Sequence, residues 1–93
     1  MPFDRHALIE FGEGLYGTEW RRALARALGP LHPKGARPTI DPRLPARWAT
    51  GERDIPPWVG PAVLRLARER LQRIEDYARE AGIDLTKPAE GGE

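Results

Sequence analysis

The sequence of 93 residues contains no cysteine and no serine, and only two histidines, His6 and His32. Without cysteine there is no disulfide and no thiolate ligand for a metal, so the fold must hold by packing alone. Ser/His/Asp and Cys/His nucleophiles are excluded as well. His32 has no second histidine or clustered carboxylates near it at ligand spacing, which favours a loop residue over a metal ligand. We therefore expect a protein that is not an enzyme, with no metal and no cofactor.

A long apolar run is also missing. No segment approaches the roughly 18 to 20 apolar residues that cross a bilayer. The N-terminus, M-P-F-D-R-H, lacks the basic start and apolar middle of a signal peptide. We expect a cytoplasmic protein without membrane contact. The length allows one domain with one modest core, predicted over residues 1–82, which favours a binding module over an elaborate catalyst.

Positive charge is concentrated in the middle of the chain, although the formal net charge is only +1. Residues 1–17 carry −2, residues 18–53 carry +5 from eight basic and three acidic side chains, and residues 54–93 carry −2. Such a basic segment favours contact with a polyanion. A solvated basic surface is an equally good interpretation of the charge alone.

The first helix is predicted over residues 4–15, where apolar side chains recur at spacings of three and four before Gly17. The same stretch contains G-E-G-L-Y-G, residues 12–17, which matches the dinucleotide fingerprint G-x-G-x-x-G. That fingerprint needs a preceding strand and a second strand carrying an acid for the ribose. No segment here is typical of a buried strand, so nucleotide binding is disfavoured.

The clearest helix is predicted over residues 18–28, T-E-W-R-R-A-L-A-R-A-L. Thr18 is placed to cap it, and Gly29-Pro30 ends it. An apolar stripe lies on one side and arginines on the other, where Arg21 has the pattern of an ordinary surface charge. Residues 31–40 show no apolar period and form a loop or an extended arm.

Residues 41–51, D-P-R-L-P-A-R-W-A-T-G, combine a capping Asp, an early Pro and a terminating Gly. As a helix they have a core side and a small, basic side that suits a nucleic acid groove. Pro45 would remove the first internal hydrogen bond of a helix capped by Asp41, which favours a start nearer Leu44. The core side comprises Leu44, Pro45, Trp48 and Ala49. The basic side comprises Arg43, Ala46, Arg47 and Thr50.

A last, long helix is predicted from Pro61 to Ala81, after a proline-rich turn in which Ile55, Trp58 and Val59 seal the core. Its apolar residues repeat at spacings of 3, 4, 3, 4 and 3, as in a heptad seam. We expect the first half of the seam to pack on the domain and the part after Leu71 to extend beyond it. Either a partner helix or packing against the first helix would cover the rest of the seam. Gly82 ends the helix, and residues 83–93 are expected to form a flexible tail. The expected dimerisation residues are Leu64, Ala67, Leu71, Ile74 and Ala78.

The run L-Y-G-T-E-W-R-R-A-L-A-R-A-L-G, followed by R-L-P-A-R-W-A-T-G-E-R-D-I-P-P-W-V, resembles small bacterial and phage helix-turn-helix regulators of the Cro/repressor (XRE-like) family. There, a segment of the type ALAxxLG precedes a reader helix ending in R-W-x-x-G and a proline-rich turn. The resemblance covers about residues 15–70. It implies sequence-specific DNA binding as a homodimer, with Arg43, Ala46 and Arg47 facing bases and Trp48 in the core.

Two features depart from that family. Its helices are joined by a turn of a few residues, whereas eleven residues separate Gly29 from Asp41 here. Pro45 also stands where the family has an aliphatic core residue. The long connection is therefore either an arm that contacts DNA or a tolerated insertion, and its cations favour contact.

The predicted function is that of a repressor-like transcriptional regulator in an all-α helix-turn-helix domain of four or five helices. Residues 41–50 would read the major groove of double-stranded DNA. The alternative is a protein-binding adaptor that uses the long helix without binding DNA. Nothing in the sequence identifies a small-molecule effector. The expected DNA-binding residues are Arg22, Lys34, Arg37, Thr39, Arg43, Ala46, Arg47 and Thr50.

Overall fold

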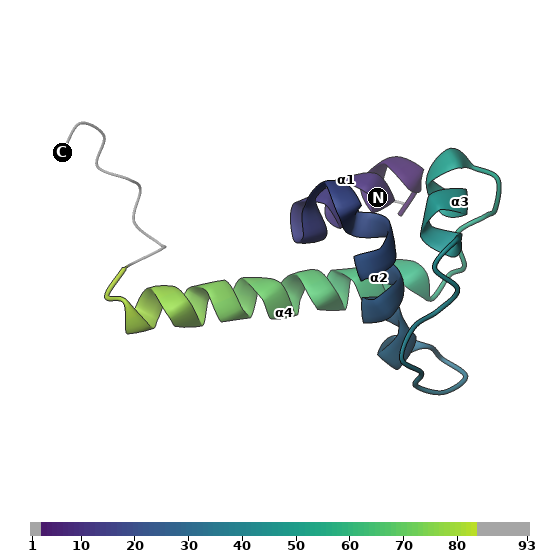
Figure 1. The fold of residues 1–93 in the computed structure, drawn as a ribbon. Helices are drawn as coiled ribbons and strands as arrows, with labels where there is room; N and C mark the ends of the chain where they lie inside the picture. Colours follow the sequence, from purple (N-terminus) through teal and green to yellow (C-terminus); the bar gives the residue numbers. More distant parts are fainter. Residues whose placement is uncertain (1–2, 84–93) are drawn as a thin grey trace.

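A computed structural model describes residues 3–83, and over this range the chain is all-α, without a strand. The predicted tail lies outside the described residues apart from Ile83. Helices α1 to α3 gather around the start of α4, and the second half of α4 projects away from them (Figure 1). The α-helices are α1 (Arg5–Tyr16), α2 (Trp20–Leu28), α3 (Leu44–Thr50) and α4 (Val59–Glu80), and the 3₁₀ helices are η1 (Gly17–Glu19) and η2 (Gly29–Leu31).

The limits of α1 agree with its predicted range. A carboxylate oxygen of Asp4 accepts a hydrogen bond from the Ala7 N–H at 2.9 Å, and Gly17 ends the helix with a φ of 77°. The predicted cap of the next helix is wrong, because Thr18 lies inside the 3₁₀ turn η1 and α2 begins only at Trp20. A turn this tight joins α1 directly to α2.

One core forms where α1, α2, α3 and the start of α4 meet, and it includes Trp20 and Trp48 as predicted. The indole of Trp20 lies against Gly12 of α1, where a Cβ would overlap the ring. Gly12 therefore allows two helices to approach closely, and Gly17 forms a turn. These two glycines of G-E-G-L-Y-G have packing and turn roles. The fully buried side chains of the core include Leu8, Leu24, Leu28, Val59 and Val63.

The long connection between α2 and α3 runs back along α2. The Arg37 N–H donates to the Gly29 carbonyl and the Ile40 N–H to the Ala25 carbonyl, both at 3.1 Å. A side chain at Gly29 would collide with the backbone of the connection, since a Cβ there would lie 2.6 Å from the Thr39 Cα. This antiparallel course differs from the short turn of a helix-turn-helix, in which the second helix starts just beyond the end of the first.

Helix α4 starts at Val59, two residues before its predicted first residue Pro61. It ends as predicted: the Ile83 N–H donates to the Ala78 carbonyl at 2.7 Å, the Gly82 N–H donates to the Arg79 carbonyl at 3.1 Å, and Gly82 has a φ of 78°. These are the two hydrogen bonds of a Schellman motif. None of the helices within residues 3–83 is long and apolar enough to cross a membrane.

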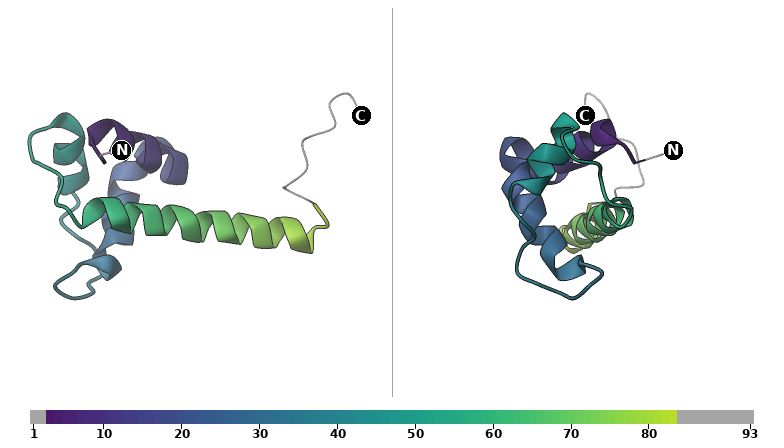
Figure 2. Two further views of the ribbon diagram at one scale, coloured as in Figure 1. Left: turned by 180° about the vertical axis from the view of Figure 1, so that it is seen from behind. Right: turned by 90° about the vertical axis from the view of Figure 1, so that its right-hand side faces the viewer.

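The side of α4 that faces the core is not the predicted seam. Val59 and Val63 are fully buried, whereas Leu64 is 42% exposed. The expectation that the first half of the seam packs on the domain is therefore wrong for Leu64, although Ala67 is half-buried beside α1. Seen along α4, helices α1 to α3 cover one side of it and leave the other open (Figure 2). The helix carries two apolar stripes, of which the domain covers one.

Candidate nucleic-acid interface

Helix α3 begins at Leu44, and the three residues before it form a turn held by Asp41. The backbone carbonyl of Asp41 accepts a hydrogen bond from the Leu44 N–H at 3.0 Å. The carboxylate of Asp41 accepts a second one from the Arg43 N–H, also at 3.0 Å. Asp41 is therefore not the N-cap of a helix spanning residues 41–50, and the later start that Pro45 favours is confirmed. Pro45 is the second residue of α3, where the helix needs no N–H donor.

The two sides of α3 have the predicted character. Pro45 and Trp48 are buried in the core, while Arg43 and Thr50 are exposed on the other side. Ala46 and Arg47 are half-buried on that outer side. Gly51 ends the helix in the left-handed conformation, with a φ of 82°.

A concavity of about 420 Å³ lies between the start of α2 and the outer side of α3, and we refer to it as the α2–α3 cleft. The backward course of the connection creates it, because α3 thereby starts beside the first turn of α2 rather than after its last turn. Four arginines and one glutamate surround a small residue, Ala46. The lining residues are Glu19, Arg21, Arg22, Pro42, Arg43, Ala46 and Arg47.

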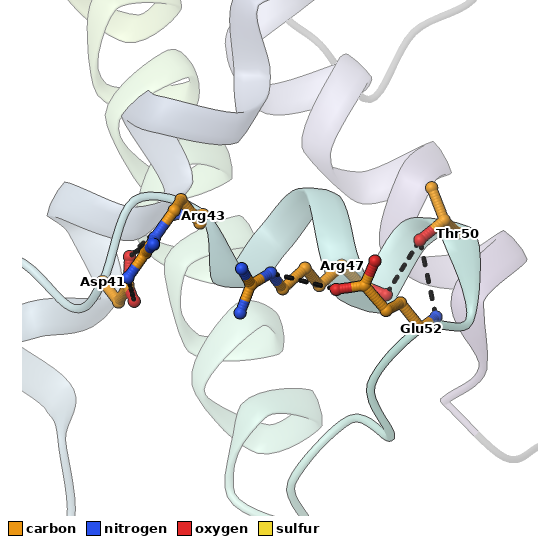
Figure 3. Close-up of polar contacts among 5 residues, drawn as sticks. All are labelled: Asp41, Arg43, Arg47, Thr50 and Glu52. Carbon is orange, nitrogen blue, oxygen red and sulfur yellow. Dashed lines mark hydrogen bonds and ion pairs between the residues drawn. The ribbon is translucent and has the colours of Figure 1, made fainter.

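Two of these arginines form ion pairs with carboxylates close in sequence (Figure 3). Arg43 contacts Asp41 through two nitrogens, with Nε to Oδ1 at 3.2 Å and Nη2 to Oδ2 at 3.0 Å. The Nε of Arg47 lies 3.0 Å from Oε2 of Glu52. Since the carboxylate of each pair is exposed to solvent, each pair contributes little to stability, and an incoming anion can replace the carboxylate.

The electrostatics of the cleft reflect these contacts. Hydrogen bonds from the Arg43 side chain and N–H hold the pKa of Asp41 below its usual value, and the same pair raises the pKa of Arg43. The Arg21 guanidinium lies over the Trp20 ring, 5.2 Å from its centroid. Arg22 makes no ion pair with any residue in the range 3–83. The cleft thus holds arginines that are oriented but open to solvent.

The expected residues of the connection lie elsewhere. Arg37 and Thr39 line a separate cavity of about 310 Å³, together with His32, Trp48 and Trp58. Neither belongs to the lining of the α2–α3 cleft, and the cavity that they line meets α3 at Leu44 and Trp48 instead.

Residues 32–37 of the connection also contact one another. The Lys34 N–H donates to the His32 Nδ1 at 3.1 Å, and the Arg37 Nε donates to the Gly35 carbonyl at 3.3 Å. His32 also stacks on Trp58, with ring centroids 5.1 Å apart. Partial burial, with the charges of Arg37 and Lys34, lowers the pKa of His32. A neutral imidazole is what the turn requires, because its Nδ1 is an acceptor.

Thr50 takes part in the end of α3 rather than in the cleft. Its hydroxyl donates to the Arg47 carbonyl at 3.2 Å and accepts from the Glu52 N–H at 3.4 Å (Figure 3). Its carbonyl accepts from Nη1 of Arg5 at 3.4 Å, which ties α3 to α1. The role of Thr50 seen here is structural.

Glu19 and Arg21 line the cleft, although sequence patterns did not single them out. Both belong to the first turn of α2, and only the backward course of the connection brings α3 beside them. No local signal in the sequence reports that course. Of the predicted set, the cleft unites Arg22, Arg43, Ala46 and Arg47.

Within residues 3–83 no group of three or more His, Cys, Asp or Glu side chains is arranged to hold a metal ion. No protein-family model matches the sequence, and no curated protein and no solved structure is significantly similar to it. The resemblance to Cro/repressor regulators therefore stays a prediction.

Proposed function

We propose that the protein binds double-stranded DNA through the α2–α3 cleft and regulates transcription in this way. The observation that carries this proposal is the arrangement of Arg21, Arg22, Arg43 and Arg47 around Ala46 on one open surface. The guanidinium fork of arginine matches O6 and N7 of guanine in the major groove, and it also pairs with phosphate oxygens. A small residue between the arginines lets the edge of a base approach the helix.

Each part of the cleft has a distinct role in this proposal. Arg43, which directly precedes α3, and Arg47, on α3, lie four residues apart on the same side and contact bases. Arg22, on α2, contacts a phosphate and fixes the position of α3 without reading sequence. Asp41 and Glu52 orient the two reading arginines in the free protein and give way to DNA, since exposed ion pairs exchange at little cost.

The proposal departs from the predicted helix-turn-helix in two respects. The reader is α3, Leu44–Thr50, which starts three residues later than the predicted segment 41–50. Lys34, Arg37 and Thr39 lie outside the cleft, so the proposal assigns them no base contact. A phosphate contact by Lys34, whose side chain is exposed, is tested separately below.

The experiment is selection of bound sites from random duplex DNA, followed by affinity measurements on the selected duplex. Arg47→Ala should weaken binding to the selected site by roughly 1 to 3 kcal/mol and relax its specificity at one position. Arg22→Ala should weaken binding to all sequences alike and reduce the salt dependence by about one phosphate contact. Arg79→Ala, at the far end of α4, is the matched control and should leave binding unchanged.

Lys34→Ala tests the arm. Weaker binding to all sequences would add the arm to the phosphate-contacting surface, and unchanged binding would leave the arm as an insertion. Unchanged affinity after loss of both Arg43 and Arg47 would contradict the assignment of α3 as the reader.

A second candidate function is a protein-binding adaptor, and the exposed apolar side chains of α4 favour it. Leu71, Ile74 and Tyr77 are 56%, 47% and 72% exposed. The adaptor predicts no retardation of DNA fragments at low salt and a stable complex formed through residues 64–78. We favour DNA binding by a homodimer because it uses both the cleft and the exposed stripe.

A further inference from the structure

We infer that two copies of the chain pair through α4 in an antiparallel arrangement, with the second half of one α4 on the first half of the other. The contact surface is the seam formed by Leu64, Ala67, Leu71, Ile74, Ala78 and Ala81. This inference deepens the proposed homodimer, and it does not depend on DNA binding. Its basis is the pattern of exposed apolar and charged residues on the projecting helix.

The seam is symmetric about its own midpoint. Reversing its direction places Leu71 opposite Ile74 of the second copy, Ala67 opposite Ala78, and Leu64 opposite Ala81. Every layer of the seam is then apolar on both sides, because the spacings 3, 4, 3, 4 and 3 are the same in both directions. Leu64, Leu71 and Ile74 are each more than 40% exposed in the single chain, so they are available to the second copy, whereas Ala78 is only 7% exposed and adds little new contact area.

Charge complementarity selects the antiparallel direction. Arg68 and Glu75 flank the seam on the same edge of α4, both are exposed, and within residues 3–83 neither forms an ion pair. In the antiparallel register, Arg68 lies within two residues, about 3 Å along the axis, of Glu75 of the second copy. The two-fold axis makes this pair occur twice.

A parallel pair lacks this contact. It would place Glu75 beside Arg70 of the second copy, in the manner of parallel heptads. Arg70 is half-buried, and its Nη1 already donates to the Leu15 carbonyl at 2.9 Å. Arg68 would then face Val63, which is fully buried in the core of its own domain.

A shallow groove between α1 and α4 extends the surface. It has a volume of about 230 Å³ and an almost entirely apolar lining, and it includes Ala67 of the seam. Gly14 lies on its wall, and a Cβ placed there would meet nothing within 4 Å. The antiparallel register brings the end of the second α4 to this groove, where the exposed Tyr77 and Ile83 of that copy supply apolar surface.

The arrangement also places the two domains suitably for DNA. The core side of α4 lies about a quarter turn around the helix from the seam, so the two-fold axis leaves both domains on the same side of the helix pair. The starts of the two α4 helices are 27 residues apart in this register, or about 40 Å. Successive major-groove half-sites on one face of DNA are roughly 34 to 36 Å apart.

The test is charge reversal, with the molar mass measured by sedimentation equilibrium in the absence of DNA. The unmodified chain should form a dimer. Arg68→Glu or Glu75→Arg alone should weaken the dimer by roughly tenfold, because each creates two like-charge contacts. The double variant, Arg68→Glu with Glu75→Arg, should restore the dimer. Arg73→Glu changes the net charge equally but lies away from the seam, so it should have little effect.

The outcomes separate the possibilities. A monomer at high concentration overturns the inference, as does a double variant that fails to regain the dimer. Disruption by Glu75→Arg but not by Arg68→Glu would indicate the parallel pair. Leu71→Lys should abolish the dimer while leaving the helical circular dichroism intact, since the side chain is exposed in the single chain. DNA binding is measured separately, so a monomer that still selects a duplex would contradict only this inference.

Discussion

The two halves of α4 differ in what covers them, although their apolar residues follow similar spacings. In the first half, Val59 and Val63 are fully buried, and this part of α4 packs on α1 and α2. In the second half, Leu71 and Tyr77 are more than half exposed. Periodicity in a helix therefore identifies an apolar stripe, but the rest of the fold decides which stripe is covered. Stability is concentrated in the domain, and the projecting half is available for association.

The largest expected effect contrasts the same substitution in the two regions. Leu24→Ala removes a fully buried side chain from the core and should lower the free energy of unfolding by about 2 to 5 kcal/mol. Leu71→Ala removes an exposed side chain and should change the stability of the monomer by less than about 0.5 kcal/mol. Urea unfolding measures both changes in stability, at protein concentrations low enough for the chain to be a monomer. Equal losses would mean that the second half of α4 is covered in the single chain.

A smaller effect is expected from two glycines of α1. Gly12→Ala forces a methyl group into the Trp20 ring and should cost about 1 to 3 kcal/mol. Gly14→Ala meets open space and replaces a helical glycine, so it should stabilise the fold by roughly 0.5 to 1 kcal/mol. Thermal unfolding of both variants checks the signs. Destabilisation by Gly14→Ala would show that the groove wall is already filled.

The smallest expected effect is on the stability of the protein at low pH. Hydrogen bonding from the Ala7 N–H lowers the pKa of Asp4 below its usual value of 3.8. Its contribution to stability is therefore present at neutral pH and is lost as the pH falls through about 4 and below, because the unfolded chain takes up the proton first. Asp4→Asn should show a smaller drop in unfolding temperature between pH 7 and pH 3 than the unmodified protein. An identical drop would contradict the capping role.

Local signals in the sequence predicted much of this structure. The terminating Gly17, Gly51 and Gly82 and the core position of Trp48 depend on neighbours within a few residues, and the structure confirms them. The late start of α3 also followed from Pro45, because proline lacks the donor that a helix interior needs.

Features set by distant contacts were not predicted. The connection folds back because Arg37 and Ile40 bond to the carbonyls of Gly29 and Ala25, which are peptide groups without a sequence signature. Arg21 joins the cleft for the same reason. Arg22, Arg43 and Arg47 were predicted as contact residues from charge and helical geometry, but their shared surface depends on that fold-back.

The most direct test of DNA binding at the cleft is a map of backbone amide shifts in the ¹⁵N-labelled protein on addition of a selected duplex. We expect the largest shifts at Arg22, Ala46 and Arg47, with smaller ones through the rest of α3. The amides around Leu71 and Ile74 should not move beyond the changes produced by dimerisation alone. Shifts confined to α4, or none when any duplex is added, would contradict the account.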